Sequence, residues 1–450
     1  MILPGLTLTN RDLRIEREQL FDEGRHMTDA VEEDFDKLEI LNLEIDPSLQ
    51  TRAQALLDVS AALPMREDYP YSEPSDLEGI RAGRSEGPRR FAETLDDAQL
   101  HDRLLGAWLG RCSGCLLGKP VEGWLSGVMW PYLKELGRYP LRDYFRSDVP
   151  QEVAEKYHLQ RERAYIDRVQ HMVEDDDTNY TVTGLAIMER FGPGFTPEDV
   201  ALFWLENLPM FHTYTAERVA YRNLANLVPP PNSGAYRNPF REWIGAQIRA
   251  DFWGYAAVGS PELAAEFAWR DASISHIKNG IYGEMWVAAM LACAPFAKDA
   301  RQVIEWGLSE VPANSRLSEN IHMVMDWHDK SLTWEQAISE IHQRWDESWA
   351  HHWCHTLSNA QIVALGLLWG EDDFEKSICR AVQACFDTDC NGATVGSIFG
   401  MLHGASSLPE KWIGPLNDGL ETGIAGYHFV ILSDMARRTL DLAKKVRAGW

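Results

Sequence analysis

The sequence predicts an all-α protein, with an N-terminal acidic extension over residues 1–96 and one helical domain over residues 97–450. From Asp97 onward, long stretches carry apolar residues at the spacing of one helix face. The alternation with β-branched residues that is typical of strands is scarce. No repeat of about 20–50 residues indicates a solenoid. One helical domain explains this pattern best.

The first hundred residues have the composition of an extension with helices of its own. Residues 11–35 are charged and compatible with a helix, and residues 47–63 form an amphipathic stretch. Residues 64–90 are rich in Pro, Gly, Ser and charge, which indicates a linker or a wrapping segment. Such an extension can cover a cleft or form an oligomer interface.

Charge and composition exclude several classes of partner. The 450 residues include 43 Lys and Arg against 68 Asp and Glu, a formal net charge of −25. This excess disfavours nucleic acid and anionic membranes as partners, because both bind clustered Lys and Arg. No secretory signal and no uninterrupted apolar run of about 18 residues is visible. With seven cysteines, an odd number, we expect a cytoplasmic protein with reduced thiols.

Two predicted helices carry glycine at every fourth position. The first stripe is Gly106, Gly110, Gly114 and Gly118, and the second is Gly392, Gly396, Gly400 and Gly404. Residues four apart share a helix face, and each interior glycine costs about 1 kcal/mol relative to alanine. The stripes therefore predict that another backbone passes close to each helix. Cys112 and Cys115 form a lone C-x-x-C, which we interpret as helical core residues rather than a redox or zinc site.

Two clusters of carboxylates directly precede predicted helices. Residues 174–177 read Glu-Asp-Asp-Asp, and Asp387 and Asp389 stand in apolar sequence before the second glycine-striped helix. One or two acidic residues are ordinary at a helix start, but four in succession repel one another unless something positive neutralises them. Buried carboxylates need a proton, a base or a metal. Oxygen ligands at this density suit Mg²⁺, Mn²⁺ or Ca²⁺, and two such clusters predict a two-metal site.

Two other polar groups have alternative interpretations. His351, His352, Cys354 and His355 are types of zinc ligand, but they are too crowded for all four to reach one tetrahedral ion. We interpret these histidines as core residues or as supports of a site. Arg249 and Asp251 are interpreted as a structural pair, although Arg249 can also meet an anionic substrate.

Three motifs in this order make the chain resemble the ADP-ribosylglycohydrolase superfamily. GRCSGCLLGKPVEG, which contains Glu122, resembles the family's opening helix; Asp175–Thr178 resembles its T-D-D-T; and Phe386–Asn391 resembles its G-D-T-D-T-N. The stretch DASISHIKNGIYGEM is similar to the family's substrate-side helix. The resemblance covers about residues 97–450 and points to a bacterial branch of the superfamily.

The resemblance implies a compact orthogonal all-α fold with two divalent metal ions, Mg²⁺ or Mn²⁺. It implies hydrolysis of an N- or O-glycosidic bond of an ADP-ribose conjugate. The implied metal ligands are Asp175, Asp176, Asp177, Asp387 and Asp389, and the implied catalytic carboxylates are Glu122 and Asp177. The implied substrate contacts are Gly118, Ser275, His276, Asn279, Tyr282 and Cys390. The chain departs from the family at Cys115, where the family has Asp, and at Cys390, where it has Thr; a thiol is a poor ligand for Mg²⁺.

Three functions remain open at this point. The first is a metal-dependent glycohydrolase acting on a small-molecule or ADP-ribosylated substrate. The second is a nucleoside or other N-glycoside hydrolase, which the absence of an evident Lys/Arg-rich or Gly-rich phosphate loop favours. The third is a non-catalytic binding protein, against which the metal-matching aspartates and Glu122 argue.

Overall fold

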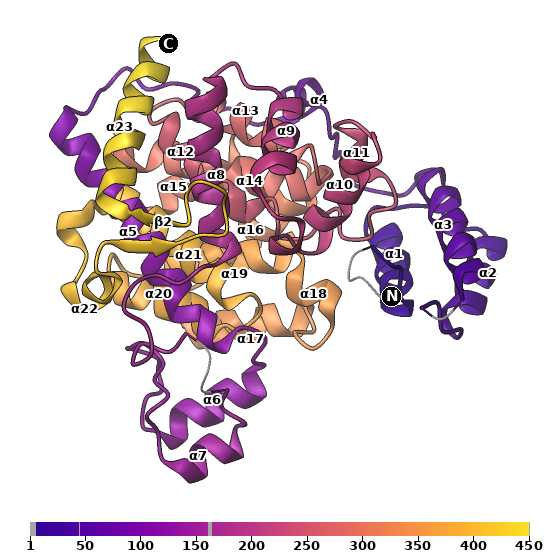
Figure 1. Ribbon diagram of the computed structural model, residues 1–450, viewed down its shortest axis with the longest axis horizontal. Coiled ribbons are helices and arrows are strands. Elements are labelled where there is room, and N and C mark those ends of the chain that lie inside the picture. The colour runs from indigo at the N-terminus through magenta and orange to yellow at the C-terminus, as the bar shows by residue number, and fades with distance from the viewer. Residues whose placement is uncertain (1–5, 45, 161–163, 450) are drawn as a thin grey trace.

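The computed structural model describes residues 6–44, 46–160 and 164–449, and their regular secondary structure is almost entirely helical (Figure 1). The all-α prediction is confirmed. Besides the helices, the described residues form a small antiparallel ribbon of β1 (Gly419–Glu421) and β2 (Phe429–Ile431). The extension contains α1 (Asn10–Asp22), α2 (Asp29–Glu39), α3 (Pro47–Ala61) and α4 (Leu77–Gly83).

The helices that follow make up the body. They are α5 (Asp97–Gly118), α6 (Ser126–Glu135), α7 (Gln151–Lys156), α8 (Asp176–Phe191), α9 (Pro197–Asn207), α10 (Thr215–Ala225), α11 (Asn232–Ala235), α12 (Asp251–Ala256), α13 (Pro261–Ala272), α14 (Lys278–Cys293), α15 (Ala300–Leu308), α16 (Arg316–Asp329), α17 (Trp334–Arg344), α18 (Ala350–Cys354), α19 (Thr356–Leu368), α20 (Phe374–Gln383), α21 (Thr388–His403), α22 (Glu410–Ile413) and α23 (Leu432–Ala448). Short 3₁₀ turns are η1 (Lys119–Val121), η2 (Met210–His212), η3 (Gln247–Arg249), η4 (Ala294–Phe296), η5 (Ala405–Ser407) and η6 (Gly414–Leu416).

The centre of the body is built from helices that are buried on every side. Every residue of α14 and α19 is buried, and α21 is buried except at its last residue. A helix with apolar residues all round belongs in the core of a large domain. Within the described residues, no helix is both long enough and apolar enough to cross a membrane. All seven cysteines are buried and none forms a disulfide.

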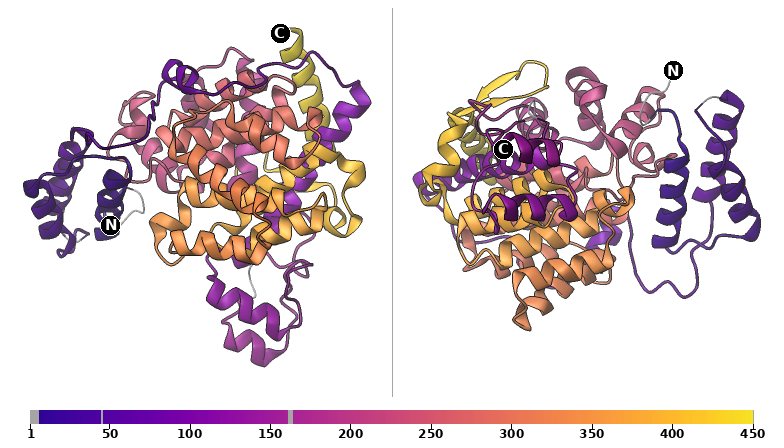
Figure 2. Two further views of the ribbon diagram at one scale, coloured as in Figure 1. Left: turned by 180° about the vertical axis from the view of Figure 1, so that it is seen from behind. Right: turned by 90° about the horizontal axis from the view of Figure 1, so that it is seen from below.

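The extension forms a separate layer at one side of the body (Figures 1 and 2). Helices α1–α3 share an apolar cluster of their own, in which Phe35 is fully buried. Residues 64–96 then run over the body, where Arg84 pairs with Glu310 at 2.7 Å. Of the two interpretations of this segment, the structure shows the wrapping one.

Buried ion pairs join the extension to the body. Arg241 lies 2.5 Å from carboxylate oxygens of both Glu16 and Glu23. Glu73 enters the body and pairs with Arg316 at 2.8 Å. Because buried charges are tolerated only when they are paired, these contacts define one position for the extension.

Helices α5 and α21 run antiparallel with glycine facing glycine. The facing pairs are Gly106 with Gly400, Gly110 with Gly396, and Gly114 with Gly392. A Cβ atom built on Gly110 would lie 2.1 Å from the carbonyl oxygen of Gly396. No side chain fits in that space, so the close approach requires glycine. The close packing predicted from the two stripes is confirmed.

We expect Gly110→Ala to destabilise the fold by about 3 kcal/mol, the upper part of the usual range for overpacking a tight interior. The added methyl group would force α5 and α21 apart. Chemical denaturation followed by circular dichroism measures the change.

The matched control is Gly127→Ala, because a Cβ atom there has no neighbour within 4 Å and the residue lies in α6. This variant should be as stable as the parent or slightly more stable. Equal stability of the two variants would contradict the close helix contact.

Candidate metal centre

Three chain segments bring carboxylates to one cavity of about 430 Å³. These segments are the turn that follows α5, the start of α8 and the start of α21. The lining residues are Lys119, Glu122, Glu174, Asp175, Asp176, Asn179, Phe211, His212, Tyr214, Thr215, Glu217, Ile244, Gly245, Ile248, Trp353, Cys354, Asp387, Asp389 and Cys390. The two acidic clusters, far apart in the sequence, therefore meet at one place.

The carboxylate of Asp175, directly before α8, fixes where this helix begins. Asp175 is the N-cap residue, and its Oδ1 accepts a hydrogen bond from the backbone N of Asp177 over 2.9 Å. This cap satisfies one of the free N–H groups of the first turn. It also turns the following carboxylates toward the end of α5, where Arg111 contacts Asp177.

The start of α21 is set by an unusual turn and by α5. Cys385 and Phe386 have φ values of 67° and 58°, a left-handed conformation that costs a non-glycine residue about 1–2 kcal/mol. Asp387 follows directly as the N-cap residue. Thr388 Oγ1 then donates to the carbonyl oxygen of Gly118 over 2.9 Å. Gly118, predicted to contact substrate, lies in this helix contact and does not line the cavity.

Ligand-type atoms form three neighbouring groups in this region. Within each group the atoms lie within 4.8 Å of one another: Glu122 with Asp387 and Asp389; Asp177 with Asp389 and Cys390; Cys115 with Asp175 and Asp177. Asp389 and Asp177 each belong to two groups, so the three groups are continuous. Asp176 lines the cavity but belongs to none of them.

Two cationic side chains from one end of α5 balance part of this charge. Arg111 is fully buried and lies 3.2 Å from Asp177 Oδ1 and 2.7 Å from Asp251 Oδ2. Lys119 contacts Asp175 Oδ2. Among the described residues that line the cavity, Lys119 is the one lysine or arginine. The cavity is therefore left with a large excess of carboxylates.

Within the three groups, two carboxylate oxygens receive no hydrogen bond from any described residue. Asp177 Oδ2 and Asp389 Oδ1 are both buried. A buried carboxylate oxygen without a partner is costly. Both oxygens therefore have the chemistry and the position of ligands to a bound cation.

The crowding of carboxylates shifts their pKa values. Burial and the neighbouring Asp175 raise the pKa of Asp177 well above its ordinary value. The negative charge of the neighbouring Asp389 is the main cause that raises the pKa of Glu122 to about 9. Burial acts to raise the pKa of Asp175, but the Lys119 ammonium and the hydrogen bonds that Asp175 makes together outweigh it and hold this pKa below its ordinary value. Such a cluster cannot hold all its charges unaided, and bound cations would relieve it.

Of the other predicted substrate contacts, Cys390 lines the cavity. Ser275, His276, Asn279 and Tyr282 do not. Ser275 Oγ and His276 Nδ1 are buried and hydrogen-bonded to each other at 2.8 Å. Asn279 Nδ2 donates to Glu73 Oε1 over 2.8 Å. The hydroxyl of Tyr282 donates to the carbonyl of the proline that follows Glu73. Asn279 and Tyr282 are therefore hydrogen-bonded to the extension and do not face the cavity.

Arg249 holds buried carboxylates together and does not pair with Asp251. Its guanidinium lies 2.6 Å from Asp271 and 2.9 Å from Glu217, one of the cavity-lining residues. Asp251 pairs with Arg111 instead. Both residues are therefore structural, as interpreted from the sequence, but with different partners.

The Nδ1 atoms of His351 and His355 are already engaged as hydrogen-bond acceptors. Trp243 Nε1 donates to His351 Nδ1 over 3.0 Å, and the backbone N of Leu357 donates to His355 Nδ1 over 3.1 Å. A neutral imidazole that accepts at Nδ1 carries its proton on Nε2. His351 Nε2 then donates to Asp22 over 3.1 Å, so this histidine holds α1 against the body.

A spacing in the sequence indicates the positions of the two cationic side chains, Arg111 and Lys119. Arg111, Cys115 and Lys119 follow one another at four-residue intervals, one position after the first glycine stripe. Asn359 also supports the site, because its Oδ1 accepts from the backbone N of Asp387 over 3.3 Å. No pattern in the sequence indicates that role.

Comparison with known proteins gives the family. The ADP-ribosylglycohydrolase family matches residues 96–447, so the chain belongs to this family, a family of hydrolases. An uncharacterized protein of Archaeoglobus fulgidus is 25% identical over 185 residues, which cover 40% of this chain and 55% of that protein. The chain thus spans about half the length of this curated relative. A solved ADP-ribosylglycohydrolase-related protein complex matches 77% of this chain and 99% of its own, with a TM-score of 0.45 and 18% identity.

We expect Arg249→Met to lower the free energy of unfolding by about 3–5 kcal/mol, because it leaves buried carboxylates without their cation. Arg437→Met is the matched control, since Arg437 is a surface residue whose side chain is 59% exposed and pairs only with neighbours on α23. That control should change stability by less than about 1 kcal/mol. Urea denaturation of both variants checks this, and a small loss for Arg249→Met would contradict the structural role.

Proposed function

We propose that the chain is a metal-dependent glycohydrolase that cleaves an N- or O-glycosidic bond of an ADP-ribose or ribosyl conjugate. The observation that carries this proposal is the convergence of the two acidic clusters in one cavity. The proposed ligands of two Mg²⁺ or Mn²⁺ ions are Asp175, Asp176, Asp177, Asp387 and Asp389. Buried oxygens of Asp177 and Asp389 without hydrogen bonds support this assignment.

Two bound cations would supply Lewis acidity toward sugar hydroxyls and toward a water molecule. The chain supplies the positions of the reacting groups. Arg111 holds one oxygen of Asp177 and leaves the other for the cluster, so Asp177 is better suited to ligation than to proton transfer. The contact with Arg111 also orients the Asp177 carboxylate before substrate binds.

We assign proton transfer to Glu122. It lies just after α5, is exposed at the cavity and neighbours Asp387 and Asp389. A carboxylate in this position can take a proton from the attacking water or steady the positive charge that develops at the anomeric carbon. Lys119, held against Asp175, reduces the repulsion that an anionic substrate would meet.

A second candidate is hydrolysis of a neutral riboside such as a nucleoside. The scarcity of Lys and Arg in the lining favours it, because a pyrophosphate is usually bound by cations or by backbone N–H groups. The adjoining groove contains Arg168 beside Lys119. Glu122, Glu174 and Glu421 also line it, so its charge does not favour a phosphate either.

Assays with Mg²⁺ or Mn²⁺ on ADP-ribosyl-arginine, ADP-ribosyl-serine, ADP-ribose derivatives and nucleosides decide between these candidates. Turnover of ADP-ribosyl compounds supports the first candidate, and turnover of nucleosides alone supports the second. No turnover by metal-loaded protein would reject both and favour a binding protein.

We expect the parent chain to bind about two divalent ions and the Asp387→Asn and Asp389→Asn variants to bind fewer. The reason is that each substitution removes a negative oxygen from the cluster. Equilibrium dialysis with elemental analysis gives the stoichiometry. Asp441→Asn, on the exposed surface of α23, is the control and should bind as the parent does. Unchanged stoichiometry in both cluster variants would rule out this centre.

A further inference from the structure

Two thiols lie inside the carboxylate cluster. Cys115 Sγ lies within 4.8 Å of oxygens of Asp175 and Asp177, and Cys390 Sγ lies within 4.8 Å of oxygens of Asp177 and Asp389. Two ligand atoms that each bind one ion at about 2.3 Å can be no more than about 4.6 Å apart. The spacing of these atoms is therefore close to that of a shared ion.

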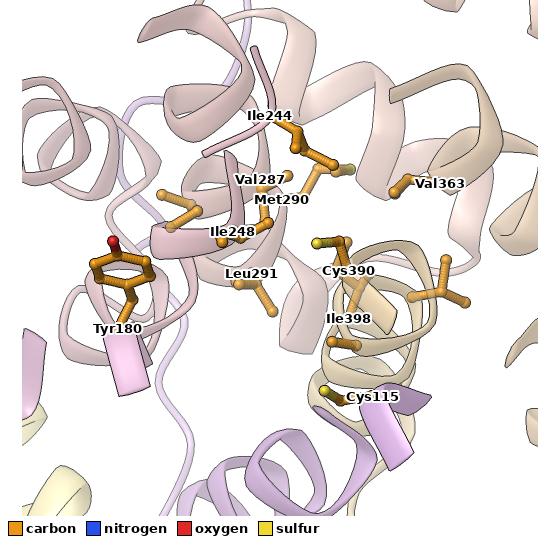
Figure 3. Close-up of a cluster of buried hydrophobic side chains, with 14 of the residues drawn as sticks. Cys115, Tyr180, Ile244, Ile248, Val287, Met290, Leu291, Val363, Cys390 and Ile398 are labelled. Atoms are coloured by element: carbon orange, nitrogen blue, oxygen red, sulfur yellow. The ribbon is translucent and has the colours of Figure 1, made fainter. Parts of the chain in front are cut away.

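The thiols come from the two glycine-paired helices. Cys115 lies on α5 and Cys390 on α21, and Figure 3 shows both among buried apolar side chains. Cys115 is fully buried and Cys390 is 6% exposed. The close approach of α5 and α21 is what brings these two side chains to the same carboxylate, Asp177.

A second observation points to a cation at this place. Asp177 Oδ2 and Asp389 Oδ1 are buried and accept no hydrogen bond from any described residue. The other oxygen of Asp177 is taken by Arg111. The atoms without partners thus belong to the groups that contain the thiols.

The neighbouring group has a different chemistry. Glu122, Asp387 and Asp389 offer oxygen alone, and Glu122 is exposed. Oxygen ligands suit hard ions such as Mg²⁺, whereas thiolates suit softer ions such as Zn²⁺. The two neighbouring metal positions therefore offer ligands of different hardness, and Asp389 belongs to both.

We propose that the inner position, formed by Asp177, Asp389 and Cys390, binds a borderline divalent ion such as Zn²⁺, Co²⁺ or Fe²⁺ through the sulfur of Cys390. Cys115 belongs to the adjacent group with Asp175 and Asp177. The outer position beside Glu122 takes Mg²⁺ or Mn²⁺. The Cys390 thiol releases its proton to solvent when it binds the ion. This inference rests on the proposed metal centre and specifies its donor atoms.

The test is titration of the chelator-treated full chain with Co²⁺, which reports on sulfur ligands through a sulfur-to-cobalt charge-transfer absorption in the near ultraviolet. The parent chain should show this absorption. Cys390→Ser should lose it. Cys112→Ser is the matched control, because Cys112 is buried on α5 but outside the three groups, and it should keep the absorption.

Circular dichroism and the bound Co²⁺ measured by elemental analysis accompany each spectrum. Co²⁺ bound by the folded parent chain without the absorption, or an absorption that persists in Cys390→Ser, would overturn the thiol ligand and leave the proposed centre intact. No Co²⁺ bound by the folded parent chain would overturn both the thiol ligand and the proposed centre.

Discussion

The glycine-to-glycine contact between α5 and α21 determines where every group of the candidate site lies. Because no Cβ intervenes, the two backbones approach more closely than side chains would permit. The contact continues to the helix ends, where Thr388 donates to the carbonyl of Gly118. The start of α21 is thereby held beside the end of α5, and Asp387 and Asp389 lie next to Glu122. A wider contact would move these carboxylates apart.

Helix α5 serves a second purpose on the face next to its glycines. Arg111 and Lys119 are directed at the acidic start of α8 and neutralise part of it. What remains is a cavity rich in carboxylates. One oxygen of Asp389, which lines it, and one of Asp177, buried behind it, receive no hydrogen bond from any described residue. Most of the net charge of −25 lies elsewhere on the chain; a few residues concentrate charge where bound cations would reverse its sign.

Much of this arrangement could be predicted from sequence, because the signals are local. Helical periodicity gave the fold class, and the repeated spacing of four gave the close contact of two helices. The positions of Asn279 and Tyr282 could not be predicted, since they depend on Glu73 and its neighbour entering the body from more than 200 residues away. The partners of Arg249 and of the histidines likewise follow from tertiary packing, which no spacing in the sequence encodes.

The most direct test of the account is anomalous X-ray diffraction from crystals of the full chain soaked in Mn²⁺. The account predicts two adjacent anomalous peaks, both in the region bounded by Asp177, Asp387 and Asp389. The absence of any peak in that region, with Mn²⁺ bound only at surface carboxylates, would contradict it.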